Sequence, residues 1–292
     1  MDLGSGVCEQ SVRWDYGAIN WEGRGSERGL RGIAFSEDLV IIAASDELLL
    51  YDKHLNIVDR FGNAYLKHCH EIFIEANVVW LSSTAFDSVI GFDLEMGRFS
   101  NGYHLVRGYP NRLARKAQSF PTYSVRQFDP EGEDGPRMED RLHVNNVWRH
   151  DEWLLMSGTE LRHIVAVRDG RSSVFARVPI GTHNAQPYLG GVIANHTAEN
   201  RIVYMNKNGR PMRSFPIMTY DEADLLNSSL PADHARQAFG RGLCVWQQRL
   251  VIGGSSPATI SVFDFDTGER VDSFNITMDM RNAIHGLEIW PF

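Results

Sequence analysis

Five histidines stand at the start of short apolar runs, and they are the residues of this sequence best suited to chemistry: His68, His70, His143, His183 and His285. Imidazole nitrogens from separate chain segments can surround one Zn²⁺, Fe²⁺ or Mn²⁺ ion. Such a centre with an open coordination position polarises a substrate oxygen or activates a water molecule. The sequence therefore predicts a divalent metal ion (Zn, Fe or Mn) bound by these five residues.

The histidines occupy matched positions when the apolar runs are aligned. Placing Asn77 opposite Glu152 sets His68 against His143, and the same register sets His143 against His183. Since His70 follows His68 by two residues, both side chains would point to the same side of a strand. The alignment leaves open which of these two faces the metal.

Other polar residues surround the same strand starts. Arg31 and Arg241 occupy them in two further copies, where each precedes a glycine and an apolar run, and a guanidinium there could bind a carboxylate or phosphate. We predict Arg31, Arg241 and Glu71 as catalytic residues. The predicted substrate-binding residues, also suited to supporting the metal ligands, are Asn145, Asn146 and Gln186.

A repeat of roughly 40 residues must position these side chains. Each copy contains short β-branched and aromatic runs separated by turn residues, the pattern of four-stranded propeller blades. Five full copies begin near residues 31, 68, 143, 183 and 240. The first strand of each blade lines the central channel, so the matched residues would meet at the mouth of that channel.

A sixth copy begins at residues 284–292 and would be completed by the strand-like stretch at residues 5–21. We therefore predict an all-β, six-bladed β-propeller closed by pairing its C-terminal strand with its N-terminal segment; the alternative is five blades. The whole chain, residues 1–292, would be one domain. Two insertions, residues 107–142 and 218–239, interrupt the repeat before an inner strand and are predicted to cover the channel mouth.

Bulk properties narrow the function classes. The net charge of −8 argues against a nucleic-acid partner, and no apolar run approaches the roughly 18–20 residues that span a bilayer. Residues 1–10 lack the basic start and apolar core of a signal peptide. The three cysteines are widely spaced, which favours a reducing, cytoplasmic location. The oligomeric state stays open.

The Arg/His-Gly-apolar strand starts and the Phe-Asp-x-x-x-Gly turns resemble those of the gluconolactonase and streptogramin lyase group of six-bladed propellers. That resemblance implies a channel metal used for lactone hydrolysis or eliminative ring opening. We expect a metal-dependent lyase, hydrolase or isomerase that acts on a small polar or anionic molecule. The alternative is a non-catalytic propeller that binds a protein or glycan.

Overall fold

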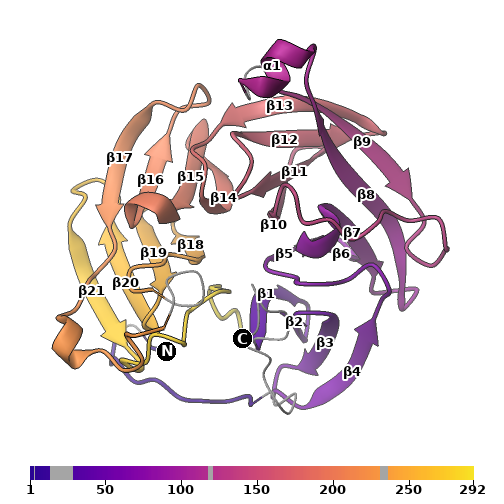
Figure 1. The fold of residues 1–292 in the computed structure, drawn as a ribbon. Helices are drawn as coiled ribbons and strands as arrows, with labels where there is room; N and C mark the ends of the chain where they lie inside the picture. The colour runs from indigo at the N-terminus through magenta and orange to yellow at the C-terminus, as the bar shows by residue number, and fades with distance from the viewer. Residues whose placement is uncertain (3, 14–28, 118–120, 231–235) are drawn as a thin grey trace.

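The computed structural model describes residues 1–2, 4–13, 29–117, 121–230 and 236–292. Over these residues the chain forms five antiparallel sheets around a central axis (Figure 1). In every sheet the strands follow one another in chain order, as in the blades of a propeller. The all-β propeller is confirmed, and the described residues contain five blades, which is the alternative form of the prediction.

Each sheet is named here from its inner strand outwards. The first contains β1 (Leu30–Ser36), β2 (Leu39–Ala44), β3 (Glu47–Asp52) and β4 (Ile57–Gly62). The second contains β5 (Ile72–Glu75), β6 (Val78–Ser83), β7 (Ser88–Asp93), β8 (Arg98–Gly108) and β9 (Thr122–Phe128). The third contains β10 (Val144–His150), β11 (Trp153–Gly158), β12 (His163–Arg168) and β13 (Arg171–Arg177). The fourth contains β14 (Thr182–Tyr188), β15 (Gly191–His196), β16 (Arg201–Met205) and β17 (Pro211–Pro216). The fifth contains β18 (Gly242–Trp246), β19 (Leu250–Ser255), β20 (Thr259–Asp264) and β21 (Arg270–Asn275).

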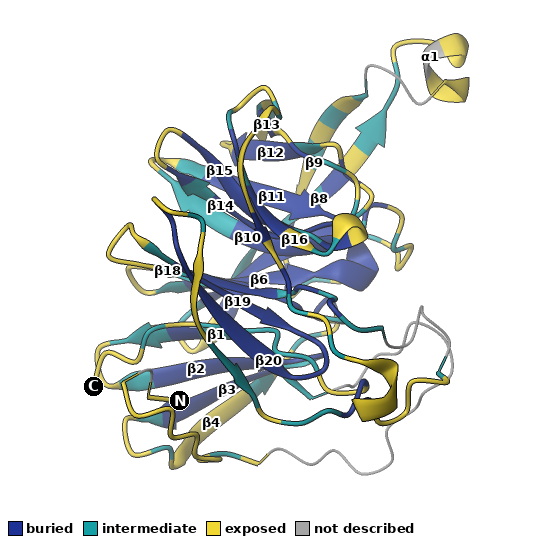
Figure 2. Cartoon of the chain, turned by 90° about the vertical axis from the view of Figure 1, so that its left-hand side faces the viewer, coloured by how far each residue is buried: buried dark blue, intermediate teal, exposed yellow. Residues whose placement is uncertain are grey.

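The polarity of each run explains its place in the sheet. The second and third strands are nearly continuous apolar runs, such as β2 and β3, and both of their faces are buried between neighbouring sheets (Figure 2). The fourth strands are polar and exposed, as in β4. The inner strand is therefore held from behind by two buried strands, which gives its first residues a fixed position near the axis.

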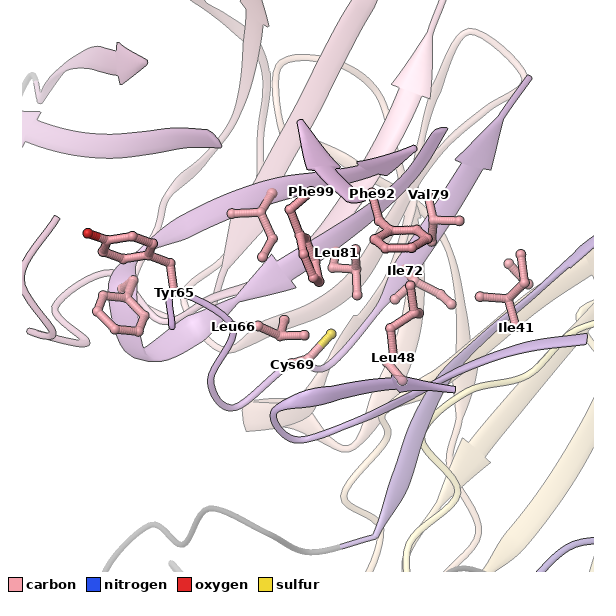
Figure 3. Packing of buried hydrophobic residues seen from close by; sticks show 14 of the residues in the cluster. Ile41, Leu48, Tyr65, Leu66, Cys69, Ile72, Val79, Leu81, Phe92 and Phe99 are labelled. Atoms are coloured by element: carbon pink, nitrogen blue, oxygen red, sulfur yellow. The ribbon is translucent and has the colours of Figure 1, made fainter. Parts of the chain in front are cut away.

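The apolar side chains between sheets form the core. Between the first and second sheets, Ile41 and Leu48 pack with Val79 and Phe92 in one buried cluster (Figure 3). Cys69 belongs to the same cluster and is fully buried, and burial raises the pKa of its thiol to about 12. Although Cys69 stands between two histidines in sequence, its environment is that of a core residue.

The C-terminal segment closes the ring between the fifth and first sheets, and Figure 1 shows the C-terminus beside β1. The amide of Gly242 donates to the carbonyl of Ile284 at 3.0 Å, and the amide of Ile284 donates to the carbonyl of Ser255 at 3.2 Å. Leu287 packs on the apolar cluster of the fifth sheet, while Trp290 meets Phe35 of β1 with ring centroids 5.4 Å apart.

This segment occupies the place predicted for a sixth inner strand, yet it forms no regular strand. The predicted partner, residues 5–21, contains no strand over residues 5–13, and residues 14–21 lie outside the described part of the chain. The described residues therefore do not build the sixth blade. The C-terminal segment helps to close the ring through its side chains, but it forms no regular strand pairing with a neighbouring strand.

The two insertions take different courses. The first begins with the short helix α1 (Arg112–Lys116), which projects away from the axis, and then adds β9 to the outer edge of the second sheet (Figures 1 and 2). Its last residues return to the inner strands, where the amides of Arg141 and Leu142 donate to the Asp87 carboxylate. The second insertion ends at the strand starts with Phe239. The described residues contain no helix long and apolar enough to cross a membrane.

Candidate metal centre

Three histidines from three successive sheets meet near the axis. His70 lies two residues before β5, His143 directly precedes β10, and His183 is the second residue of β14. One ligand nitrogen of each lies within 4.8 Å of those of the other two. The ring centroids are 5.4 Å apart for His70 and His143, and 6.2 Å apart for His70 and His183. Of the five predicted histidines, these three form a group that could hold a metal ion; we call them the histidine cluster.

The other two predicted histidines flank the cluster. The ring of His285, carried by the closing segment, lies 5.6 Å from that of His70. His68 is not part of the ligand group; instead its backbone carbonyl lies 2.7 Å from Nδ1 of His70. His68 and His143 share a left-handed backbone, with φ of 54° and 51°. The two positions therefore match in backbone conformation, as the alignment predicts. The side chain of the second sheet that joins the cluster is nevertheless that of His70.

Hydrogen bonds fix the tautomer of His70. Its Nδ1 faces two oxygens, the His68 carbonyl and Oγ1 of Thr84 at 2.9 Å. The Thr84 hydroxyl itself donates to the Val144 carbonyl at 2.7 Å, so its oxygen accepts from the ring. Nδ1 of His70 therefore carries the proton, and Nε2 keeps its lone pair. Such outer hydrogen bonds are typical of metal-binding histidines.

His143 is oriented in the same way by a carboxylate. Its Nδ1 lies 2.9 Å from Oδ1 of Asp140, which favours a proton on Nδ1 and a lone pair on Nε2. The ring of His183 packs edge-on against Phe239 at 5.5 Å. Its Nδ1 is buried and makes no hydrogen bond to a described residue. Hydrogen bonds therefore hold the rings of His70 and His143, and packing against Phe239 holds the ring of His183.

Two arginines sit beside the cluster. Nη1 of Arg31 lies 3.0 Å from Nε2 of His70, and Nη1 of Arg241 contacts Nε2 of His285. The guanidinium of Arg241 also stacks on Phe239, with 4.2 Å from its central carbon to the ring centroid. Arg31 and Arg241 therefore stand at the site that the sequence predicts, each as a hydrogen-bond donor toward a histidine.

Electrostatics keep the buried histidines neutral. Burial, followed by the charge of Arg31, lowers the pKa of His70 well below its usual value. Burial, followed by the charge of Arg241, lowers the pKa of His183 well below its usual value. Neutral imidazoles offer the lone pairs that a metal ion requires, so both rings are ready ligands at pH 7.

Glu71 is a buried carboxyl group directly after His70. Burial raises its pKa well above the usual value, and the charge of Arg31 and a hydrogen bond from Asn184 offset this only in part. Gln186 extends the same network, because its Nε2 donates to Oδ1 of Asn184 and to the Leu243 carbonyl, both at 2.9 Å. The second, fourth and fifth sheets are therefore joined by a polar network that includes a buried carboxyl group with a raised pKa.

The predicted substrate-binding residues Asn145 and Asn146 make contacts between sheets. Nδ2 of Asn146 donates to the Ala185 carbonyl at 2.7 Å, and Nδ2 of Asn145 donates to the Thr182 carbonyl at 3.3 Å. Oδ1 of Asn145 makes no hydrogen bond to a described residue. These contacts set the spacing of the third and fourth sheets, and a role in substrate binding stays a prediction.

Sequence reasoning did not identify four residues that shape the site: Thr84, Asp140, Asn184 and Phe239. Only Asp140 carries a local signal, a carboxylate three residues before a predicted histidine ligand. Thr84 and Phe239 reach the cluster from segments outside the aligned strand starts.

No protein-family model matches this sequence, and no curated protein matches it significantly. Solved structures with a similar fold include the computationally designed Ika8 protein, with 11% identity, coverage of 91% of this chain and 94% of that chain, and a TM-score of 0.48. Virginiamycin B lyase from Staphylococcus aureus has 11% identity, coverage of 89% and 73%, and a TM-score of 0.49. The WD40 propeller domain of Doa1 has 12% identity, coverage of 87% and 73%, and a TM-score of 0.49. Function is therefore argued from the site itself.

Proposed function

We propose that this protein is a metal-dependent enzyme that acts on a small anionic molecule near the axis, where its inner strands begin. The observation that carries the proposal is the histidine cluster, in which three imidazole nitrogens from three sheets lie within 4.8 Å of one another. Two of these rings have Nδ1 occupied by a hydrogen bond, which leaves the lone pair on Nε2 as the one that could bind a metal. Zn²⁺, Fe²⁺ and Mn²⁺ all accept such ligands.

The residues fit a metal ion after a modest adjustment. Zinc–nitrogen bonds are about 2.0–2.1 Å, so three ligand nitrogens must approach to within roughly 3.5 Å of one another. Arg31 donates to Nε2 of His70, the lone pair that a metal would use, so its guanidinium would move aside on binding. His285 stands next to the cluster as a fourth ligand or as the partner of Arg241.

Charge favours an anionic substrate. A divalent ion would join Arg31 and Arg241; among the described residues Asp140 is the carboxylate that contacts the cluster, and burial raises the pKa of Glu71 well above its usual value. A carboxylate or phosphate group would offset this positive charge, and Arg31, once displaced from His70, would be placed to bind it.

The reaction class follows from these parts. A bound metal ion would supply Lewis-acid polarisation of a substrate oxygen or of a water molecule. Arg31 and Arg241 would orient the anionic group, and the buried carboxyl of Glu71, whose pKa is raised, would be a source of a proton. This set suits a lyase, hydrolase or isomerase step on a small hydroxy or carbonyl compound.

The experiment is metal analysis of protein purified without a polyhistidine tag, together with an activity screen on small lactones, hydroxy acids and phosphate esters. We expect one equivalent of a divalent metal in the wild type and loss of metal and activity in His143→Ala and His183→Ala. His54→Ala is the matched control, since His54 is exposed on the first sheet. Metal-free protein, or full activity in both cluster variants, would contradict the proposal. A metal-free protein that still binds a protein or glycan would instead favour the non-catalytic alternative.

A further inference from the structure

A cavity of about 700 Å³ is lined by residues of the third and fourth sheets and by Ala117 and Pro121 of the first insertion. None of the residues of the histidine cluster lines it. Pockets for small molecules usually measure about 300–1,000 Å³ and combine an apolar floor with a few polar groups. This cavity has the size of a ligand site and is separate from the metal centre.

The inner wall of the cavity is apolar. Val178, Val203 and Met205 line it, and all three side chains are buried. Pro179 and Pro211 also line the cavity. A hydrocarbon or aromatic group placed here would lie against apolar atoms on both sheets.

The charged lining residues are mainly arginines: Arg162, Arg177 and Arg201 accompany one carboxylate, Glu199. Arg201 is paired with Glu199 at 3.4 Å. The side chains of Arg162 and Arg177 make no hydrogen bond or ion pair with a described residue. Within the described residues, two arginines without a side-chain partner therefore line the same cavity.

His163 also lines the cavity. Burial, followed by the charges of Arg177 and Arg162, lowers the pKa of His163. Its Nδ1 also lies 2.9 Å from the hydroxyl of Tyr123. The imidazole is therefore neutral at pH 7 and adds a polar, uncharged group beside the two guanidiniums.

The two walls are held together by backbone contacts, so the cavity is already formed without a ligand. The amide of Arg177 on β13 donates at 2.9 Å to the carbonyl of Lys207, in the turn between β16 and β17. Gly209 of that turn has φ of 80°, and a Cβ there would lie 3.0 Å from Cβ of Arg177. The close packing of the two sheets at this point therefore depends on glycine.

We infer that this cavity binds an organic anion with a carboxylate or phosphate head and an apolar body of roughly eight to ten carbons. The head would lie between Arg162 and Arg177, and the body would lie on Val178, Val203 and Met205. This inference does not depend on the proposed metal chemistry.

Isothermal titration calorimetry with decanoate, decyl phosphate and decyltrimethylammonium, each below its micellar concentration, tests the inference. We expect decanoate or decyl phosphate to bind with one site per chain, and the tighter of the two identifies the head group. The cation should bind at least tenfold more weakly, because it would meet two arginines.

The variants locate the site. Arg162→Ser combined with Arg177→Ser should weaken binding of the anion at least tenfold, since charge-assisted hydrogen bonds to both guanidiniums are lost. Arg171→Ser is the matched control, because Arg171 is an exposed arginine at the other end of β13. His183→Gln should bind the anion as the wild type does, which separates this site from the metal centre. Equal binding of the cation, no binding of either anion, or equal losses in the double variant and Arg171→Ser would overturn the inference.

Discussion

Gly286 lies where the closing segment passes the first inner strand, and replacing it with alanine should weaken closure of the ring. A Cβ built on Gly286 would collide with the backbone oxygen of Arg31 and lie 3.1 Å from Cγ2 of Ile33. Because the obstacle is backbone, the segment itself must shift. Arg31 is also the arginine that donates to His70, so a shift at this contact would disturb the histidine cluster.

The magnitude follows from two contributions. Overpacking in a well-packed region typically costs about 1–3 kcal/mol. If the segment moves away instead, Ile284, Leu287 and Ile289 lose their packing on the fifth sheet. Each of them is partly buried, which corresponds to roughly 1 kcal/mol per side chain. Either response destabilises the protein, and we expect Gly286→Ala to lower the free energy of unfolding by about 2–4 kcal/mol.

Urea unfolding followed by tryptophan fluorescence measures this change. Gly62→Ala is the matched control, since Gly62 ends β4 and a Cβ there would find its nearest atom, the Asp46 carbonyl oxygen, at 3.8 Å. That substitution should leave stability unchanged within about 1 kcal/mol. Equal unfolding midpoints for the two variants would refute the view that the segment fits tightly between the first and fifth sheets.

Three further predictions concern the histidine cluster. In metal-free protein, His70 and His183 have folded-state pKa values well below 6.5, so the unfolded state binds more protons below that pH. Their contribution to stability is complete above about pH 6.5 and is lost as the pH falls toward the folded-state pKa values. In urea unfolding, the wild type should therefore lose about 1 kcal/mol more stability than His183→Gln between pH 6.5 and pH 5.5. Equal losses in the two proteins would contradict this prediction. Asp140→Asn should weaken metal binding about 10- to 100-fold in a competition titration with a chelator, because His143 loses its carboxylate partner; unchanged affinity would show that this contact is dispensable. Thr84→Val should weaken metal binding several-fold and lower stability by about 1–2 kcal/mol, because the Val144 carbonyl loses its donor; wild-type values in both measurements would rule this role out.

Much of the fold could be predicted from the sequence because the repeat is regular. Apolar runs such as 39–44 and 78–83 have the composition of strands buried on both faces, and both are strands. Closure was harder to predict. Residues 284–292 look like another inner strand, but in the described part of the chain the segment is held by a few hydrogen bonds and side-chain packing without a ladder.

The candidate site was predictable to the level of the strand starts and no further. Alignment placed His68 opposite His143, and their backbones do match. The alignment could not show that the side chain of His70 would reach the cluster. The orientation of that ring depends on hydrogen bonds to the Thr84 hydroxyl and to the backbone carbonyl of His68. Phe239 was equally hidden, since it lies in an insertion that no repeat position aligns.

Titration of metal-free protein with Co²⁺, followed by visible absorption, tests the central claim most directly. Cobalt bound by three imidazoles in a four- or five-coordinate site gives absorption bands that octahedral aqueous cobalt lacks. We predict that these bands saturate at one equivalent in the wild type and in His54→Ala, and that they are lost in His183→Gln. Absence of bound cobalt in the wild type, or an unchanged titration in His183→Gln, would contradict a metal centre at the histidine cluster.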